Sequence, residues 1–225
     1  MISVNDVKKI YNAGNVQVNA LRGVSLTVDK GEFLSIAGPS GSGKTTLLNL
    51  IGCLDKCTEG EIRIKDTPVS QMNKNELALF RRVNLGFVFQ TFNLIPVLTA
   101  YENVSFALSL LAMDKKLLRD KTMHILNEVG LSGMENRFPS ELSGGQQQRV
   151  AIARSLVKDP EIVLADEPTA NLDSGTGKEI LTLMEKLNKD HGTVFIFSTH
   201  DKMVMDQAHR LVLLHDGKII SDKRR

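Results

Sequence analysis

A loop rich in glycine and serine follows a short apolar segment near the start of the chain, and it limits the folds open to the sequence. The stretch GPSGSGKTT occupies residues 38–46, directly after the apolar run 33–37. Gly38 and Gly43 fit the spacing GxxxxGK[ST], in which glycines let successive backbone N–H groups turn toward one oxyanion. The apolar residues 47–51 predict a following helix, whose N-terminal dipole would strengthen anion binding. We therefore expect a strand, a phosphate-binding loop and a helix, in that order.

Lys44 and Thr45, at the end of this loop, have side chains suited to a nucleoside triphosphate and Mg²⁺. The lysine would reach the β- and γ-phosphates, and the threonine hydroxyl would be a magnesium ligand. At about 4 Å and an effective dielectric constant near 20, the lysine–phosphate attraction is roughly 4 kcal/mol before desolvation. A flexible turn with an unrelated lysine is the alternative. The residues expected to bind the nucleotide are Gly38, Pro39, Ser40, Gly41, Ser42, Gly43, Lys44, Thr45 and Thr46.

Length and composition are those of one ordinary globular domain. The 225 residues can bury a sizeable core, with 42% hydrophobic and 24% charged residues. Because 28 basic residues nearly balance 26 acidic ones, we expect no nucleic-acid partner. No apolar run approaches the roughly 18–20 residues that cross a bilayer, and the first residues do not resemble a signal peptide. A cytoplasmic location is therefore expected.

The two cysteines and the basic end of the sequence are expected to have no catalytic role. Cys53 and Cys57 have no second cysteine pair or histidine cluster beside them, so we expect reduced thiols rather than a zinc site. The residues 223–225, KRR, are expected to form a solvated end, and weak attraction to anionic lipid is the alternative.

Hydrophobic patterning predicts a mixed α/β fold. Residues 16–18, 24–28 and 61–64 alternate as in short, half-buried antiparallel strands, whereas 162–164 and 194–197 are apolar on both faces, as in a parallel sheet. A helical stripe lies between those last two segments, at Ile180, Leu183, Met184 and Leu187. This strand–helix–strand order is typical of a parallel α/β fold. Residues 211–220, with Asp216 and Gly217 at the turn, predict a hairpin.

A region without strong strand patterns lies in the second half of the chain. Residues 115–129 are rich in helix formers, so we expect a mostly helical insertion here. The chain 1–225 is then one domain, with a core at about 1–90 and 156–225 and a helical subdomain at about 91–155.

Two acidic residues follow the apolar segment 162–165. A carboxylate at the carboxyl end of a parallel strand can hold Mg²⁺ through its water shell, and a second one can deprotonate an attacking water. We assign the metal role to Asp166 and the general-base role to Glu167. Without the phosphate loop, such a pair more often caps a helix, and that alternative stays open here.

A second candidate anion site is the motif LSGGQ, formed by Leu142, Ser143, Gly144, Gly145 and Gln146. The serine is a good N-cap, and the glycines allow backbone N–H groups to approach an anion at a helix N-terminus. A single bound nucleotide does not require this second site. A plain helix start is the alternative.

With the sequence QQRVAIAR after it, this motif resembles the signature of the ATP-binding cassette (ABC) ATPases. The resemblance covers nearly the whole chain. It implies an α/β P-loop NTPase fold, with a RecA-like parallel sheet core, an N-terminal antiparallel β subdomain and a helical insertion. It also implies ATP and Mg²⁺ as ligands.

Weaker motifs of the same family stand in the expected order. By resemblance, Tyr11 stacks on adenine, Gln90 contacts Mg²⁺ and the attacking water, and His200 contacts the γ-phosphate. The implied catalytic residues are Glu167, His200 and Gln90, and the implied metal-site residues are Thr45, Gln90 and, through water, Asp166. Alone, Tyr11 or His200 would more often be a packing residue.

The resemblance also explains the second anion site. In this family two ATPase domains face head to tail, and the signature serine and glycines of one close over the ATP of the other. Asn171, Leu172 and Asp173 match the loop that links the two sites. One copy of each motif implies a homodimer in the ATP-bound state.

Finer sequence features resemble one branch of the family. The stretches GFVFQTFNLIPVLTAYENV and IGCLDKCTEGEI are similar to the lipoprotein-releasing and macrolide-exporting ATPases of the LolD and MacB type. Relatives commonly have proline at the position of Cys57, a departure that we expect to be neutral. Phe92, Leu94, Ile95 and Pro96 form an apolar patch after Gln90. The family resemblance makes residues 90–96 the docking site of a membrane permease, which would hold the protein at the inner face of the membrane. Core packing is the alternative.

Two other functions remain open on the sequence. One is a soluble ABC ATPase acting as a mechanical clamp in DNA repair or translation, although 225 residues leave no room for its usual long insertions. The other is a cell-division ABC ATPase that signals through a membrane partner without transport. A transport motor is the preferred prediction, and the sequence does not identify its cargo.

Overall fold

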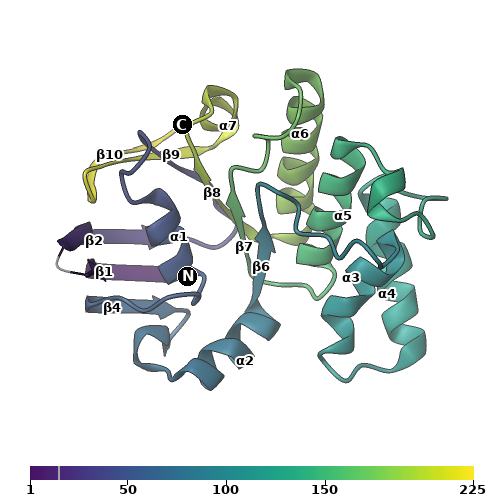
Figure 1. The fold of residues 1–225 in the computed structure, drawn as a ribbon, viewed down its shortest axis with the longest axis horizontal. Coiled ribbons are helices and arrows are strands. Elements are labelled where there is room, and N and C mark those ends of the chain that lie inside the picture. The colour runs from purple at the N-terminus through teal and green to yellow at the C-terminus, as the bar shows by residue number, and fades with distance from the viewer. Residues whose placement is uncertain (15) are drawn as a thin grey trace. The chain divides into compact units, whose positions relative to one another are not determined.

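The chain forms two compact units in a computed structural model that describes residues 1–14 and 16–225. The first unit comprises Met1–Arg81 and Val194–Arg225, and the second comprises Arg82–Thr193. Figure 1 labels most of the helices and strands of both units. The division into a core of 1–90 and 156–225 and a helical subdomain of 91–155 stays a prediction.

The first unit contains the predicted antiparallel sheet. Its strand order is β2-β1-β4-β5, and β1 is antiparallel to both β2 and β4. Alternation in β2 buries Val24, Leu26 and Val28 on one face. The strands are longer than the short segments predicted from the sequence, because register shifts in the pairing of β1 with β2 break the alternation on which that prediction relied. The strands are β1 (Ile2–Ala13), β2 (Val16–Val28), β4 (Glu59–Ile64) and β5 (Thr67–Pro68).

A second group of strands in the first unit has the order β10-β9-β3-β8. In it β3 is parallel to both β8 and β9, and every residue of β3 and β8 is buried. The rings of Phe33 and Phe197 meet edge to face, with centroids 4.6 Å apart. The predicted hairpin is confirmed, and Asp216 and Gly217 both adopt positive φ, as a tight two-residue turn requires. These strands are β3 (Phe33–Ala37), β8 (Val194–Thr199), β9 (Arg210–His215) and β10 (Lys218–Arg224).

Three helices accompany these strands. The predicted α1 (Lys44–Ile51) packs against β8 and β2, and α7 (Lys202–Gln207) packs against β3 and β8. The helix α2 (Lys74–Asn84) follows the short 3₁₀ turn Val69–Gln71 and ends within the second unit. Neither α2 nor α7 was predicted, since α7 is too short for a helical pattern and Leu77 is the one buried residue of α2.

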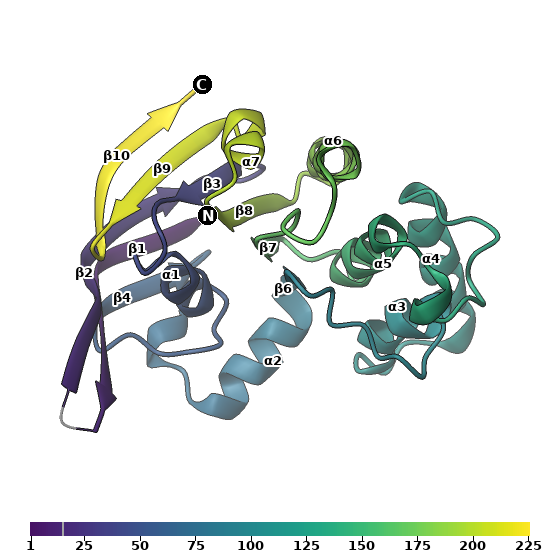
Figure 2. The same cartoon turned by 45° about the horizontal axis from the view of Figure 1, so that its top comes forward.

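The second unit pairs two parallel strands with four helices. The strand β6 (Leu85–Val88) lies beside β7 (Ile162–Asp166), and α5 packs on β6. Figure 2 shows α3 and α4 beside α5, which both of them contact. The predicted helices at 115–129 and around Ile180 are present as α4 and α6. The four helices are α3 (Ala100–Ser109), α4 (Lys115–Glu128), α5 (Gly144–Leu156) and α6 (Ser174–His191).

Two further observations concern membrane spans and cysteines. Among the described residues, no helix combines the length and the apolar character needed to cross a membrane. Cys53 and Cys57 are free thiols. Burial raises the pKa of Cys53 to about 12 and also raises the pKa of Cys57.

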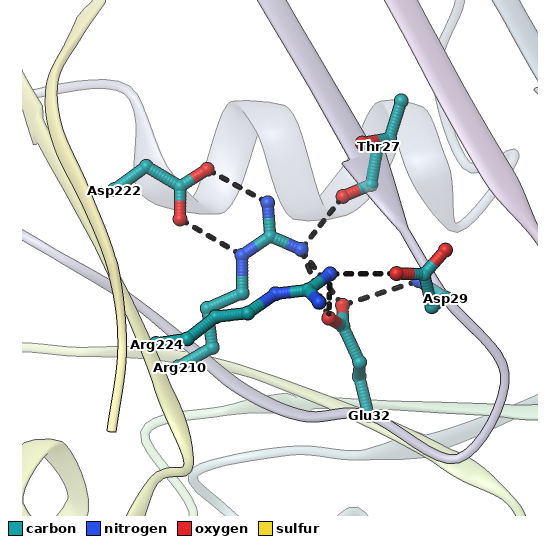
Figure 3. A network of polar contacts seen from close by, with 6 residues as sticks. All are labelled: Thr27, Asp29, Glu32, Arg210, Asp222 and Arg224. Carbon is teal, nitrogen blue, oxygen red and sulfur yellow. Dashed lines mark hydrogen bonds and ion pairs between the residues drawn. The ribbon is translucent and has the colours of Figure 1, made fainter.

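An ion-pair network fixes the end of the chain to the turn between β2 and β3 (Figure 3). The buried Arg210 donates both to Asp222, at 2.8 and 2.7 Å, and to Glu32, at 2.8 Å. Arg224 pairs with Glu32 at 2.9 Å and with Asp29 at 2.6 Å. The prediction of a solvated basic end is confirmed, because residues 223–225 are all exposed, although Arg224 also belongs to β10 and pairs with the acids of that turn.

Replacing Arg210 with methionine should destabilise the fold, because Glu32 and Asp222 would lose their shared partner. We expect the free energy of unfolding to fall by about 3 kcal/mol, as when one partner of a buried ion pair is removed. Urea unfolding followed by circular dichroism measures this loss. Lys8→Met, which breaks the exposed pair with Glu59, is the control and should change the stability far less.

The difference in unfolding free energy between wild type and Arg210→Met should also depend on pH. The hydrogen bond from Arg210 lowers the pKa of Asp222 in the folded protein. Its contribution to stability is therefore present above the unfolded-state pKa of about 3.9 and is lost as the pH falls through the folded-state value. The gap between wild type and Arg210→Met should narrow in acid, and a gap that widens there would contradict this assignment.

Candidate functional site

The predicted phosphate loop connects β3 to α1 in the first unit. Gly43 is the N-cap of α1, with a φ of 103°, and no side chain caps this helix end. The first N–H groups of α1 are thus not satisfied by a capping side chain, and the helix dipole favours an anion there. The loop combines the features that a phosphate group requires.

Two glycines of the loop are also required by close backbone packing. A Cβ atom on Gly38 would lie 2.0 Å from the carbonyl oxygen of Leu214, in β9. A Cβ atom on Gly43 would lie 2.5 Å from the carbonyl oxygen of Ala20, in β2. Because neither backbone oxygen can easily move, any side chain at these positions would displace the loop.

The ammonium group of Lys44 is hydrogen-bonded to the loop that precedes it. Its Nζ atom donates to the carbonyl oxygens of Gly38, at 2.8 Å, and Pro39, at 2.9 Å, and the residue is buried. The next residue, Thr45, is exposed in the first turn of α1. This position suits a hydroxyl ligand of Mg²⁺, a metal that prefers oxygen donors.

Tyr11 and His200 also belong to the first unit. Tyr11 is 38% exposed, and its hydroxyl donates to Asp55 at 2.8 Å. Burial and then this hydrogen bond raise the pKa of Tyr11. His200 is exposed and directly follows β8, immediately before Asp201, the N-cap of α7.

The two acids lie at the end of β7 in the second unit. Asp166 is the last residue of this strand, and Glu167 adopts a φ of 48°, which is uncommon for residues other than glycine. The helix-capping alternative is wrong, because Asp173 caps α6 by accepting the N–H groups of Gly175 and Thr176, both at 3.0 Å. The strained conformation of Glu167 is typical of a functional site.

The motif LSGGQ begins α5 as predicted. The Ser143 hydroxyl accepts the N–H of Gln146 at 3.3 Å, and the Gln146 side chain accepts the N–H of Ser143 at 2.9 Å, so that the two form a capping box. Gly145 is required locally, since a Cβ atom there would lie 2.6 Å from Cγ2 of Thr176 in α6. These contacts account for a helix start and leave the anion role a prediction.

Three polar side chains connect segments of the second unit that carry sequence motifs. Gln148, fully buried in α5, donates to the carbonyl of Pro168, next to Glu167, at 2.6 Å. Arg154 donates to the carbonyl oxygens of Phe92 and Asn93, at 2.7 and 2.5 Å. Asn171 donates to the carbonyl of Gln90 at 2.9 Å. The signature helix therefore supports both the acidic segment and the segment after Gln90.

Sequence reasoning had not given Gln148 or Arg154 a separate role. Both lie in the stretch that carries the signature, and the signal was a pair of polar residues flanking the apolar positions 150–153 of an otherwise buried helix. Buried polar side chains need partners, and here these partners are backbone carbonyls. Among the described residues, no group of three or more histidine, cysteine or acidic side chains could hold a metal by itself.

Comparison with known proteins decides the family. The family model described as "ABC transporter" matches residues 21–170. The chain belongs to the ABC transporter family. It is an ABC ATPase cassette, and the resemblance drawn from the phosphate loop and the signature is confirmed.

Two relatives place the cassette in the predicted branch. It is 45% identical over 224 residues to a macrolide export ATP-binding/permease protein, MacB, of Bdellovibrio bacteriovorus. The match covers 100% of this chain but 34% of that relative, so the chain spans about a third of its length. It is also 45% identical over 228 residues to the ABC transporter ATP-binding protein MJ0796 of Methanocaldococcus jannaschii, covering 100% of this chain and 97% of the relative.

A solved structure confirms the fold. It is described as a dimeric, post-hydrolysis state of the MJ0796 cassette bound to ADP and Pi. The TM-score is 0.90 at 45% sequence identity, with 100% of this chain and 98% of the solved chain covered. The predicted P-loop NTPase architecture is thus correct for the cassette.

We expect Arg154→Lys to loosen the segment after Gln90. Phe92 and Asn93 both have positive φ, and a lysine ammonium cannot donate to both carbonyls as the planar guanidinium does. Hydrogen exchange of residues 91–97 should become about tenfold faster, equivalent to about 1.4 kcal/mol of local stability. Mass spectrometry of deuterated peptides measures this rate.

Arg149→Lys is the matched control on the same helix. Arg149 donates to the carbonyl of Val129 at 2.8 Å, so this change should affect exchange near residue 130 and leave 91–97 unchanged. Equal exchange of 91–97 in wild type and Arg154→Lys would show that the guanidinium does not hold the segment.

Proposed function

We propose that this cassette is the motor subunit of a transporter, which dimerises on ATP and drives a separate membrane permease. Lipoprotein release or export of macrolides or peptides is the proposed task. The observation that carries the proposal is the complete phosphate loop, with its uncapped helix end and buried lysine, in a chain that matches both MacB and MJ0796 over its whole length.

ATP would be held from both ends by residues of the first unit. Loop N–H groups and Lys44 bind the phosphates, and Tyr11 stacks on adenine. By the family resemblance, Thr45, Gln90 and, through water, Asp166 would hold Mg²⁺, since oxygen atoms are suitable donors for this metal. When bound, Mg²⁺ offsets the negative charge of the phosphates during their transfer.

Hydrolysis needs a base for the attacking water. Glu167 accepts the proton of that water, and the positive φ of this residue fixes its backbone at the end of β7. His200 contacts the γ-phosphate, and Gln90 orients the water. The hydrogen bond from Gln148 to Pro168 supports the backbone beside the base.

Two copies would complete each other's sites. Ser143, Gly144 and Gly145 of one copy close over the ATP of the other, which gives the signature an anion-binding role beyond starting α5. Asn171, Leu172 and Asp173 would connect the two sites. In support, Asn171 already contacts the carbonyl of Gln90 within one copy. The dimeric MJ0796 structure with ADP and Pi supports this arrangement.

The segment 90–97 is proposed to dock the permease and to hold the cassette at the cytoplasmic face of the membrane. Phe92, Leu94 and Ile95 are half-buried, whereas Pro96 is exposed and Val97 is 76% exposed. Apolar side chains that are exposed to solvent favour the docking of a partner over the alternative of core packing. Val97 was not among the patch residues predicted from the sequence.

Glu167→Gln should bind ATP, hydrolyse it slowly and accumulate as a dimer. Loss of a general base typically reduces the rate about 10²- to 10⁴-fold. Phosphate release measures hydrolysis, and light scattering with saturating ATP measures mass. Glu179→Gln, an exposed change in α6, is the control and should leave both unchanged. A mass that stays monomeric for Glu167→Gln under saturating ATP would count against the dimer.

Val97→Asp should weaken docking at least about tenfold, because a charge would enter an apolar contact. The tagged variant would be incubated with detergent-solubilised membranes of the source organism, and the permease recovered with it quantified by mass spectrometry. Ile220→Asp is the matched control, since Ile220 is 65% exposed but lies on β10. Equal recovery with Val97→Asp and Ile220→Asp would refute docking at this segment.

A further inference from the structure

The ring of Tyr11 is held in place by two charged side chains. Its hydroxyl donates to Oδ2 of Asp55 at 2.8 Å, and Nζ of Lys9 lies 4.7 Å from the ring centroid. Lys9 also donates to Oδ1 of the same carboxylate at 2.8 Å. The aspartate thus holds the end of the ring while the ammonium covers one of its faces.

Asp55 belongs to a loop that links two functional elements. On one side, the N–H groups of Leu54 and Asp55 donate to the carbonyl of Asn49 in α1, at 2.9 and 3.4 Å. On the other side, Lys9 of β1 donates to the carbonyl of Lys56 at 2.7 Å. Because α1 begins at Lys44 and β1 carries Tyr11, this loop fixes the separation between the phosphate end and the base end of the site.

Residues at the end of this loop add to the connection. The N–H of Ile10 donates to the Thr58 hydroxyl at 3.0 Å, and the N–H of Thr58 donates to the carbonyl of Lys8 at 2.8 Å. The loop therefore follows β1 on both sides of Lys9. A displacement of Asp55 would therefore move Tyr11, because a direct hydrogen bond and the contacts of Lys9 connect the two residues.

The protonation states favour the same geometry. Burial opposes the charge of Asp55, but hydrogen bonds from Lys9 and Tyr11 outweigh it and lower the pKa of this carboxyl. Burial and the bond to Asp55 raise the pKa of Tyr11. At neutral pH the carboxylate accepts and the phenol donates, so the direction of the hydrogen bond is fixed.

We propose that Asp55 and Lys9 are positioning residues for the base end of the nucleotide site. They fix the plane of the Tyr11 ring at a set separation from α1, so that the face opposite Lys9 receives the planar base. This inference rests on the proposed function, in which Tyr11 stacks on adenine. Its consequence is that these residues determine affinity for a nucleotide but not affinity for a polyphosphate without a base.

A neighbouring ion pair provides a matched control. Lys8 and Glu59 join the same strand to β4 at 2.6 Å, but their side chains are 42% and 57% exposed. The side chains of Lys9 and Asp55 are 12% and 33% exposed. Removing the charge of Glu59 therefore tests for general damage to β1 without touching Tyr11.

The experiment compares two probes by isothermal titration calorimetry, each with Mg²⁺: the non-hydrolysable ATP analogue AMP-PNP and inorganic tripolyphosphate. The variants are Tyr11→Phe, Asp55→Ala, which removes the acceptor, their combination, and Glu59→Gln as the control. Losing the hydrogen bond to the carboxylate should weaken AMP-PNP binding about 3- to 10-fold in each of the first two variants. Tripolyphosphate binding should stay unchanged, and the double variant should be no weaker than either single one, because both remove the same contact.

Other outcomes separate the inference from the proposed function. Equal weakening of both probes would show that Asp55 supports the whole site rather than the base, and unchanged AMP-PNP affinity would show that the contact does not position the ring. Either result overturns the inference while leaving nucleotide binding intact. Wild-type protein that binds neither probe would overturn the proposed function itself. Thermal unfolding of each variant, compared with Glu59→Gln, confirms that the changes measured are not due to loss of fold.

Discussion

The arrangement of the first unit depends on the close approach of three backbone segments at the phosphate loop. The loop lies against the carbonyl of Leu214 on one side and that of Ala20 on the other, so closely that only glycine fits at positions 38 and 43. The same two glycines leave backbone N–H groups free of side-chain cover at the start of α1. Backbone packing and anion binding thus both require glycine at positions 38 and 43. A substitution there affects fold and ligand together, and the two effects cannot be separated at those positions.

In the second unit the corresponding constraint is a helix with polar side chains on its buried faces. Gln148 and Arg154 project from α5 to backbone carbonyls rather than to other side chains. Such bonds fix the course of a loop without depending on the identity of its side chains. The segments beside Glu167 and after Gln90 are therefore both hydrogen-bonded to one helix, α5, which itself begins with the signature motif. A shift of α5 would therefore move both segments together.

The sequence predicted what depends on local pattern and spacing. The strand–loop–helix of residues 33–51, the hairpin around Gly217, and the helices α4 and α6 follow from periodicity and turn chemistry within a few residues. The lengths of β1 and β2 did not, because bulges interrupt the alternation, and α7 is too short to show a period. In the candidate site, motif spacing identified Lys44 and Ser143. The supports of the site were missed because they are contacts between distant positions: Tyr11 and Asp55 are 44 residues apart, and Arg154 and Phe92 are 62 apart. No local pattern encodes such pairs.

The hairpin of β9 and β10 has a consequence for the order in which the chain is made. The N–H of Gly217 donates to the carbonyl of Ser42 at 3.0 Å, and the N–H of Arg22 donates to the carbonyl of Gly217 at 2.9 Å. Because Gly217 lies far after Ser42 in the sequence, the phosphate loop leaves the ribosome well before the residues that support it. A nascent fragment that ends before this turn lacks a wall of its own phosphate site. A nucleotide can therefore stabilise a chain that contains this turn more than a fragment that ends before it, so that ligand binding favours chains in which the hairpin has formed.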